Sequence, residues 1–195
     1  MLSIKAQIKL VVIIWLRNKV IKMEYKQIYK TSDKLDDIIM CSDGTFLTKL
    51  TFNKDNADIA ADDNLPIFDK TKKWLDIYFD GKEPDFDIEY KIDYKSSFQK
   101  EVIDILCDIK YGETITYGEI ASIIASRRGI KKMSAQAIGG AVGFNPICII
   151  VPCHRVIGKD GSVIGYGGGV KNKIELLRLE KAINSDQISD QIKTK

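Results

Sequence analysis

The chain is 195 residues long, with 45% hydrophobic and 29% charged residues, a composition typical of a globular protein with room for one large or two small domains. Its net charge of +3 is unevenly spread: residues 1–23 carry five basic residues and no acid, residues 24–95 carry 11 basic and 17 acidic, and residues 96–195 carry 14 basic and 10 acidic. The four cysteines form no CxxC pair and accompany a single histidine, which argues against a disulfide framework and a structural zinc site and favours free thiols in the cytoplasm.

Residues 1–23 do not resemble the rest of the chain. The apolar run Leu10–Leu16 is too short to span a bilayer, which needs about 20 apolar residues. Basic residues follow this run where a signal peptide would have a small-residue cleavage site. We expect a dispensable extension or an upstream start codon, with Met23 opening the first domain; membrane contact through this segment is the alternative.

Residues 24–95 predict a small α/β domain. Asp43-Gly44 lies between two apolar runs and is a strong hairpin signal. The expected elements are, in order, a strand Tyr25–Thr31, a hairpin of Ile38–Cys41 with Phe46–Phe52, a polar loop Asp55–Asn64, a helix Phe68–Phe79 and an extended linker Glu83–Tyr94. None of them carries a visible catalytic constellation.

Residues 96–183 predict a mostly helical second domain, followed by a flexible tail over residues 184–195. The expected helices are one capped by Ser96 and ended by Gly112, one opened by the Thr116–Glu119 capping box, one capped by Ser134 over Ala135–Val142, and a last one over Val170–Lys181. The second and third are short and are separated by a basic loop, as in a helix-turn-helix, although a plain helical hairpin has the same spacing. The basic excess of this half favours a polyanionic substrate.

The stretch Pro152–Val156 (PCHRV) carries the chemistry. Cys153 stands next to His154, the only histidine, and a thiol becomes a strong nucleophile when a base takes its proton. A sole histidine is also compatible with a structural role, and a bridging water could be needed to link the two side chains. Glu180 is a candidate carboxylate to orient the imidazole. We expect the remaining three cysteines to be unreactive core residues: Cys41, Cys107 and Cys148.

Two glycine clusters suggest close approach of a ligand or a neighbouring backbone. Gly167–Gly169 can bring free N–H donors close to a ligand. The chain has no GxxxxGK[ST] motif and no dinucleotide fingerprint, so a nucleotide cofactor is not supported. Gly139-Gly140 inside a predicted helix is unfavourable by about 1 kcal/mol per glycine, which indicates tight packing against either a partner helix or nucleic acid.

From Phe98 to Lys181 the chain closely resembles the methylated-DNA–protein-cysteine methyltransferases, also called 6-O-alkylguanine-DNA alkyltransferases. The matching motifs are Phe98-Gln99, Gly112–Tyr117 (GETITY), Ile138–Ala141 (IGGA), Asn145-Pro146, Pro152–Val156, Gly161, Tyr166 with the glycines after it, Leu176-Leu177 and Glu180. The N-terminal part resembles, far more weakly, the ribonuclease-like domain of this family. The resemblance therefore implies an α/β (α+β) protein: a ribonuclease H-like domain and a mostly helical, winged-helix-like domain with a helix-turn-helix.

The resemblance also implies the roles of individual residues. Cys153 would accept the alkyl group, His154 and Glu180 would form a water-linked relay, Asn145 would brace the turn, and Tyr117 would contact the target nucleotide and protonate the departing guanine. The base pocket would be lined by Pro152, Val156, Tyr166 and Gly167. DNA would be contacted by Tyr117, Gln136, Ala137, Gly139, Arg155, Arg128 and Lys132. Neither a metal nor a cofactor is expected.

Two positions depart from the family pattern. Gln136 stands where relatives commonly place an intercalating arginine, so a wedge would remain without its positive charge. The loop before it is longer, and its basic residues could contact phosphates instead: Arg127, Arg128, Lys131 and Lys132. Gly167 replaces a residue with a side-chain hydroxyl, which leaves only the backbone N–H.

The function implied is stoichiometric repair of 6-O-methylguanine, and of 4-O-methylthymine, in double-stranded DNA. A monomer would bind through the minor groove and rotate the lesion out of the stack. Two other functions share some of these residues. A non-catalytic protein that recognises alkylated DNA would lack the cysteine, and a cysteine hydrolase would need an oxyanion hole.

Overall fold

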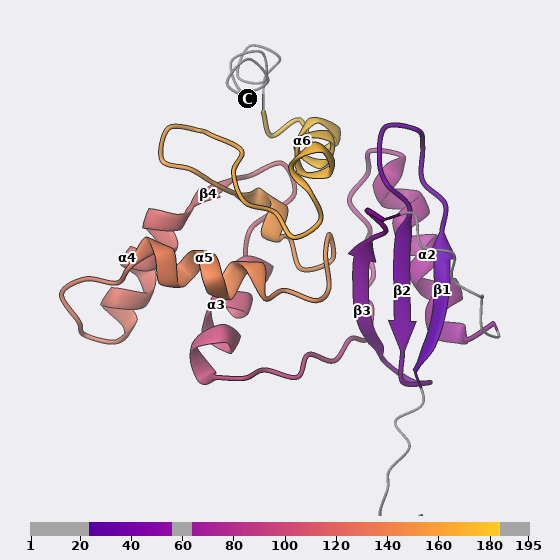
Figure 1. Ribbon diagram of the computed structural model, residues 1–195, viewed down its shortest axis with the longest axis horizontal. Coiled ribbons are helices and arrows are strands. Elements are labelled where there is room, and N and C mark those ends of the chain that lie inside the picture. The colour runs from indigo at the N-terminus through magenta and orange to yellow at the C-terminus, as the bar shows by residue number, and fades with distance from the viewer. Residues whose placement is uncertain (1–23, 56–63, 184–195) are drawn as a thin grey trace, which may run out of the picture.

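The computed structural model describes residues 24–55 and 64–183, which form an N-terminal sheet domain and a C-terminal helical domain (Figure 1). The apolar run Leu10–Leu16, most of the predicted loop Asp55–Asn64 and the predicted tail over 184–195 lie outside these residues. Within the described ranges, no helix is both long and apolar enough to cross a membrane.

The N-terminal domain is built on a three-stranded antiparallel sheet of order β1-β2-β3, with strands Tyr25–Tyr29, Ile38–Ser42 and Leu47–Phe52. The predicted hairpin is confirmed. Asp43 closes it, because its Oδ1 accepts hydrogen bonds from the backbone N–H groups of Thr45 at 3.1 Å and Phe46 at 2.9 Å, an arrangement in which a short side chain replaces a backbone turn partner.

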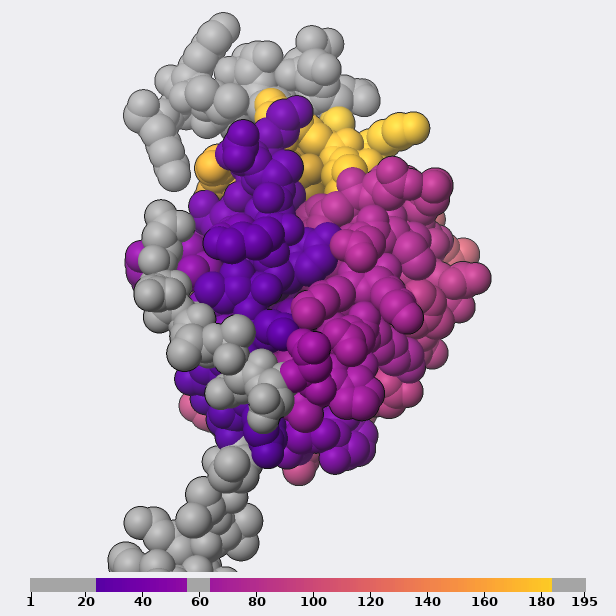
Figure 2. Space-filling model, turned by 90° about the vertical axis from the view of Figure 1, so that its right-hand side faces the viewer, coloured from indigo at the N-terminus to yellow at the C-terminus, as the bar shows by residue number. Residues whose placement is uncertain are grey.

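Helix α2, Pro66–Phe79, covers one face of this sheet (Figure 1). Pro66 suits the first turn of a helix, where its missing N–H has no intrahelical partner. The helix buries Phe68, Leu75 and Tyr78 completely. Figure 2 looks at the molecule from the side of this domain and shows residues 24–55 (indigo) packed beside the magenta segments that follow them in the chain, with α6 in yellow above.

Strand β3 also joins the two domains. The predicted linker runs beside it as an extended segment: Leu47 N–H donates to Glu89 at 2.9 Å, and Lys91 N–H donates to the Leu47 carbonyl at 2.9 Å. Further along, Leu50 N–H donates to Pro146 and the Leu50 carbonyl accepts from Cys148, both at 2.8 Å. The sheet edge is therefore bonded directly to the segment that precedes Cys153.

The C-terminal domain packs its helices around a common core and adds a short parallel pair of strands. Its elements are α3 (Ser97–Cys107), β4 (Ile115–Thr116), α4 (Tyr117–Arg127), α5 (Ala135–Gly143), a 3-10 turn η1 (Cys153–Arg155), β5 (Val156–Ile157) and α6 (Val170–Leu179). The apolar face predicted for the first of these helices is confirmed: Val102 and Leu106 are fully buried, as are Ile120 and Ile124 of α4.

Two predicted helix ends and one predicted cap in this domain differ from the structure. Helix α3 ends at Cys107, five residues before Gly112, because the chain turns so that the Ile109 carbonyl accepts a hydrogen bond from Arg155 at 2.6 Å. Helix α6 ends at Leu179, with Glu180 as its C-cap. Ser134 is the N-cap of α5 but its side chain makes no capping hydrogen bond.

The two N-caps of α4 and α5 provide a matched stability test. Thr116 and Glu119 form a complete capping box, so Thr116→Ala should lower the free energy of unfolding by about 1 kcal/mol. Ser134→Ala should change it by a few tenths of a kcal/mol at most, because no capping bond is lost. Urea unfolding of both variants measures the difference; equal losses would contradict the capping assignment.

Candidate active site

Cys153 lies at the end of two consecutive tight turns. In the first, Ile150 N–H donates to the Cys148 carbonyl at 2.9 Å around Ile149, whose φ is +71°. In the second, Cys153 N–H donates to the Val151 carbonyl at 2.8 Å around Pro152, with φ −82° and ψ 57°. Both are γ-turns, and the one with positive φ is the rare, strained form. Strain of this kind concentrates at functional sites.

Asn145 braces these turns from inside. Its Nδ2 group donates to the Val151 carbonyl at 2.9 Å, the Ile147 carbonyl at 3.3 Å and the Cys153 sulfur at 2.9 Å. Its Oδ1 accepts from the Ile147 N–H at 3.0 Å. One buried amide therefore holds the turn and directs a donor at the sulfur.

The surroundings of Cys153 favour its ionised form. The side chain is 5% exposed. A hydrogen bond from the Cys148 thiol lowers the pKa of Cys153, against the effect of burial, and the Asn145 amide and the Lys173 charge lower it further. Thiolate is the nucleophilic form of cysteine. Cys148 was expected to be an unreactive core residue; it is buried, but its sulfur contacts the reactive one.

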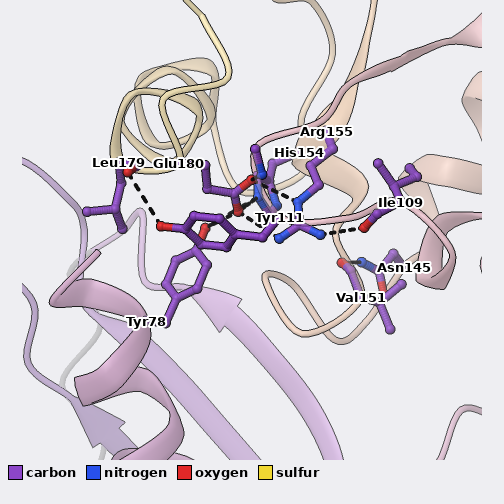
Figure 3. Close-up of polar contacts among 10 residues, drawn as sticks. Tyr78, Ile109, Tyr111, Asn145, Val151, His154, Arg155, Leu179 and Glu180 are labelled. Carbon is purple, nitrogen blue, oxygen red and sulfur yellow. Dashed lines mark hydrogen bonds and ion pairs between the residues drawn. The ribbon is translucent and has the colours of Figure 1, made fainter. Parts of the chain in front are cut away.

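A buried network of charges is centred on the carboxylate of Glu180 (Figure 3). His154 Nε2 is 2.8 Å from Glu180 Oε1, and Arg155 holds the same carboxylate through Nε at 2.8 Å and Nη2 at 2.9 Å. Burial alone would raise the pKa of Glu180, but the bonds to His154 and Arg155 bring it down to about 2. Glu180 is therefore an anion that accepts the Nε2 proton of His154.

This arrangement leaves the other nitrogen of His154 available as a base. Within the described part of the chain, Nδ1 is buried and has no hydrogen-bond partner, and no direct hydrogen bond between the His154 ring and the Cys153 sulfur is found there. Burial lowers the pKa of His154, so the imidazole is neutral at physiological pH. A neutral ring whose Nε2 proton is fixed by a carboxylate has its lone pair on Nδ1.

Lys173 is a functional residue that the sequence analysis missed. It is fully buried on α6, and its Nζ donates to the carbonyls of Val156 at 2.6 Å and Ile164 at 2.8 Å. Burial lowers its pKa to about 8, while the nearby Cys153 opposes this shift. Its spacing of three and four residues from Leu176 and Leu177 puts it on the buried face of the helix, but a long lysine side chain at such a position usually extends to solvent, so the spacing alone did not indicate a buried charge.

Two tyrosines to which the resemblance gave roles, Tyr117 and Tyr166, lie near the same sulfur. Tyr117 Oη lies 3.5 Å from the Ile164 carbonyl and 3.4 Å from that of Gly165, and negative charge on Cys153 contributes to the raised pKa of Tyr117, after burial. The hydroxyl of Tyr166 is buried. A Cβ placed on Gly167 would meet no described atom within 4 Å, so a ligand has room at this position.

The predicted DNA-contacting residues of α5 form an exposed, uncharged face. Gln136 and Ala137 are exposed, and Gly139 is half-buried. Among the described atoms, a Cβ on Gly139 would reach only Tyr117, at 4.0 Å, and a Cβ on Gly140 would meet none within 4 Å. Neither glycine is therefore needed for close packing against a described helix. A groove of about 920 Å³ lies between α4 and α5 and is lined in part by Lys131 and Lys132.

Of two arginines predicted to contact DNA, Arg155 is buried and Arg128 is exposed. Arg155 was expected to contact DNA, but it is buried against Glu180 and the Ile109 carbonyl, so its guanidinium is occupied inside the protein. Arg128 was also expected to contact DNA; it donates to Glu101 at 2.9 Å and stacks on Phe98 at 5.2 Å. Sequence alone does not separate an internally paired arginine from a free one.

The fold and the site together define a two-domain protein with an ionisable cysteine near the packed helix pair α4 and α5. Residues 97–182 match the model of the 6-O-methylguanine DNA methyltransferase DNA-binding domain, and residues 25–92 match that of its ribonuclease-like domain. The chain belongs to the 6-O-methylguanine DNA methyltransferase family.

Relatives in other organisms are similar over most of their length. The methylated-DNA–protein-cysteine methyltransferase of Haemophilus influenzae is 40% identical over 149 residues, which cover 74% of this chain and 80% of that protein. The Mycobacterium leprae protein of the same name is 41% identical over 147 residues, covering 74% and 86%. The crystal structure of Mycobacterium tuberculosis OGT in complex with DNA superimposes with a TM-score of 0.67 at 35% identity, covering 84% of this chain and 97% of that chain.

Replacing Cys148 tests its effect on the reactive thiol. In Cys148→Ala the pKa of Cys153 should rise by about half a unit to one unit, because a weak donor to the thiolate is lost. The thiolate then forms at higher pH, and reaction at neutral pH slows. Cys148→Ser keeps a donor and should stay close to the unmodified protein. The measurement is the rate of iodoacetamide addition at Cys153 against pH, followed by mass spectrometry; superimposable profiles for the alanine variant and the parent would refute the assignment.

Proposed function

We propose that this protein repairs DNA by moving the methyl group of 6-O-methylguanine irreversibly onto its own Cys153. The observation that carries the proposal is the pairing of a hydrogen-bonded, ionisable Cys153 with a neighbouring His154–Glu180 pair, beside a helix-turn-helix in a chain of this family. The thiol and its neighbouring pair are compatible with several cysteine reactions, and the family match makes methyl transfer the one proposed.

The residues supply each part of the reaction. His154 Nδ1 takes the thiol proton of Cys153 through one bridging water, and Glu180 stabilises the imidazolium that forms. The thiolate attacks the methyl carbon in line with the leaving oxygen, so that an S–C bond forms as the C–O bond breaks. Tyr117 protonates the departing guanine. The product is a thioether, which lacks a bond that this site could hydrolyse, so each molecule acts once.

The exposed face of α5 is the proposed contact with DNA. Small uncharged residues at Ala137 and Gly139 allow close approach to the floor of the minor groove, and Gln136 serves as the wedge that replaces the rotated base. Phosphates are contacted by the basic loop, with Lys132 as one of the charges. The target base then lies between Tyr117 and the segment from Tyr166 to Gly167.

Several finer features belong to the same proposal. The protein works as a cytoplasmic monomer, divided into residues 24–95 and 96–183, and also accepts 4-O-methylthymine. The non-catalytic alternative is not favoured, because Cys153 is present with its hydrogen-bond donors. A cysteine hydrolase would turn over, so hydrolysis of an ester substrate beyond one equivalent would favour that function instead.

Methyl transfer is tested with an oligonucleotide duplex that contains 6-O-methylguanine. One methyl group per protein molecule should appear on the Cys153 peptide by mass spectrometry, and no second round should follow. Cys153→Ala should abolish the transfer and keep DNA affinity within about twofold, because the thiol is not part of the DNA-contacting surface. If Cys153 of the unmodified protein gains no methyl group, the proposal is wrong.

The salt dependence of DNA binding tests the basic loop. Lys132→Ala should weaken binding to duplexes with and without the lesion alike, and should reduce the slope of log K against log[salt] by about 1. Lys82→Ala, an exposed lysine at the end of α2, is the control and should leave the slope at its parent value. Fluorescence anisotropy at several salt concentrations gives both slopes; equal slopes for Lys132→Ala and the parent would argue against the phosphate contact.

A further inference from the structure

We propose that Tyr78, which comes from the N-terminal domain, is a positioning residue for the site of the C-terminal domain, because its hydroxyl holds Glu180 against His154. This role rests on the proposed methyl transfer, since only then does the His154–Glu180 pair have a proton to move. The N-terminal domain thereby becomes part of the active site.

Three donors converge on one oxygen of Glu180. Its Oε1 accepts from Tyr78 Oη at 2.6 Å, from His154 Nε2 at 2.8 Å and from Arg155 Nη2 at 2.9 Å. Tyr78 Oη also lies 3.4 Å from His154 Nε2, so the hydroxyl contacts both members of the pair (Figure 3). Burial, and then the negative charge of Glu180, raise the pKa of Tyr78 well above its usual value, so the phenol stays protonated and donates.

Tyr78 is held rigidly on α2. Its ring stacks on Trp74 with centroids 5.4 Å apart, and it meets Phe79 at 5.4 Å and Tyr111 at 6.0 Å edge to face. The side chain is fully buried. The position of α2 is therefore transmitted to the Glu180 carboxylate by a packed aromatic cluster.

The other hydrogen bonds to the carboxylate come from the C-terminal domain. Arg155 fixes the plane of the carboxylate, because its Nε and Nη2 bind the two different oxygens, and Gly112 N–H donates to Oε2 at 3.3 Å. Tyr78 Oη is the third donor to Oε1, and it comes from the N-terminal domain. Removing the hydroxyl would leave that oxygen more strongly negative toward His154 Nε2, and a stronger negative charge there raises the pKa of the imidazole.

The test compares two single-hydroxyl deletions in the full-length protein. Tyr78→Phe removes the contact to Glu180 and keeps the ring and its stacking. Tyr111→Phe is the matched control, because its hydroxyl belongs to the same cluster but faces the Leu179 carbonyl at 3.5 Å. His154 is the only histidine, so nuclear magnetic resonance of ¹⁵N-histidine-labelled protein reports on this site alone.

In Tyr78→Phe we expect the pKa of His154 to rise by about half a unit to one unit, as the loss of one neutral hydrogen bond predicts. Single-turnover methyl transfer at neutral pH should slow by roughly two- to tenfold, because Glu180 loses one of the bonds that hold it in place and a larger share of His154 is protonated and cannot accept the thiol proton. Tyr111→Phe should leave both quantities at the parent values. The remaining charged groups that act on His154, Arg155 and Lys173, are the same in all three proteins.

Two results would overturn the proposal: an unchanged His154 titration in Tyr78→Phe, or an equal change in Tyr111→Phe, which would assign the effect to packing. The titration needs no DNA. A protein that shows the His154 shift but transfers no methyl group would therefore refute the proposed function and leave the contact between Tyr78 and the pair established.

Discussion

The buried carboxylate of Glu180 is the interaction on which the site depends. It accepts five hydrogen bonds, from Gly112, Tyr78, His154 and two groups of Arg155. A buried anion is stable only when it is paired and its lone pairs are satisfied, so these donors are a requirement of burial as well as of chemistry. Because the same bonds occupy Nε2 of His154, only Nδ1 is available to accept the thiol proton of Cys153.

A second constraint is the strained turn before Cys153. A β-branched residue such as Ile149 at φ +71° costs about 1–3 kcal/mol relative to a relaxed backbone. The bonds of Asn145 and the two main-chain bonds of Leu50 hold the chain in this shape. The N-terminal domain contributes to both constraints: Tyr78 donates to the Glu180 carboxylate, and β3 is bonded to the segment that contains the strained turn. The reactive sulfur therefore takes its position from the whole molecule.

Local signals carried most of the fold prediction. The Asp43-Gly44 hairpin, the Thr116–Glu119 capping box and the apolar face of α3 all depend on residues a few positions apart, and the structure confirms each. The PCHRV stretch identified Cys153 for the same reason. Tyr78 could not be found in this way, because it lies 102 residues before its partner Glu180 and an aromatic on a buried helix face predicts only packing. Lys173, which binds two carbonyls, was missed, and Arg155, which binds Glu180, was wrongly placed at the DNA. Sequence alone does not distinguish such a buried cation from an exposed one.

The bond between the two domains at Leu50 is made by main-chain atoms alone. Such a bond requires an extended strand whose N–H and C=O groups lie opposite those of its partner. It does not depend on which side chain stands at that position. The sheet can therefore exchange many of its residues while it continues to hold the catalytic turn, provided that the strand remains a strand. In this half of the molecule, many residues can therefore change during evolution while the backbone geometry that holds the turn is kept.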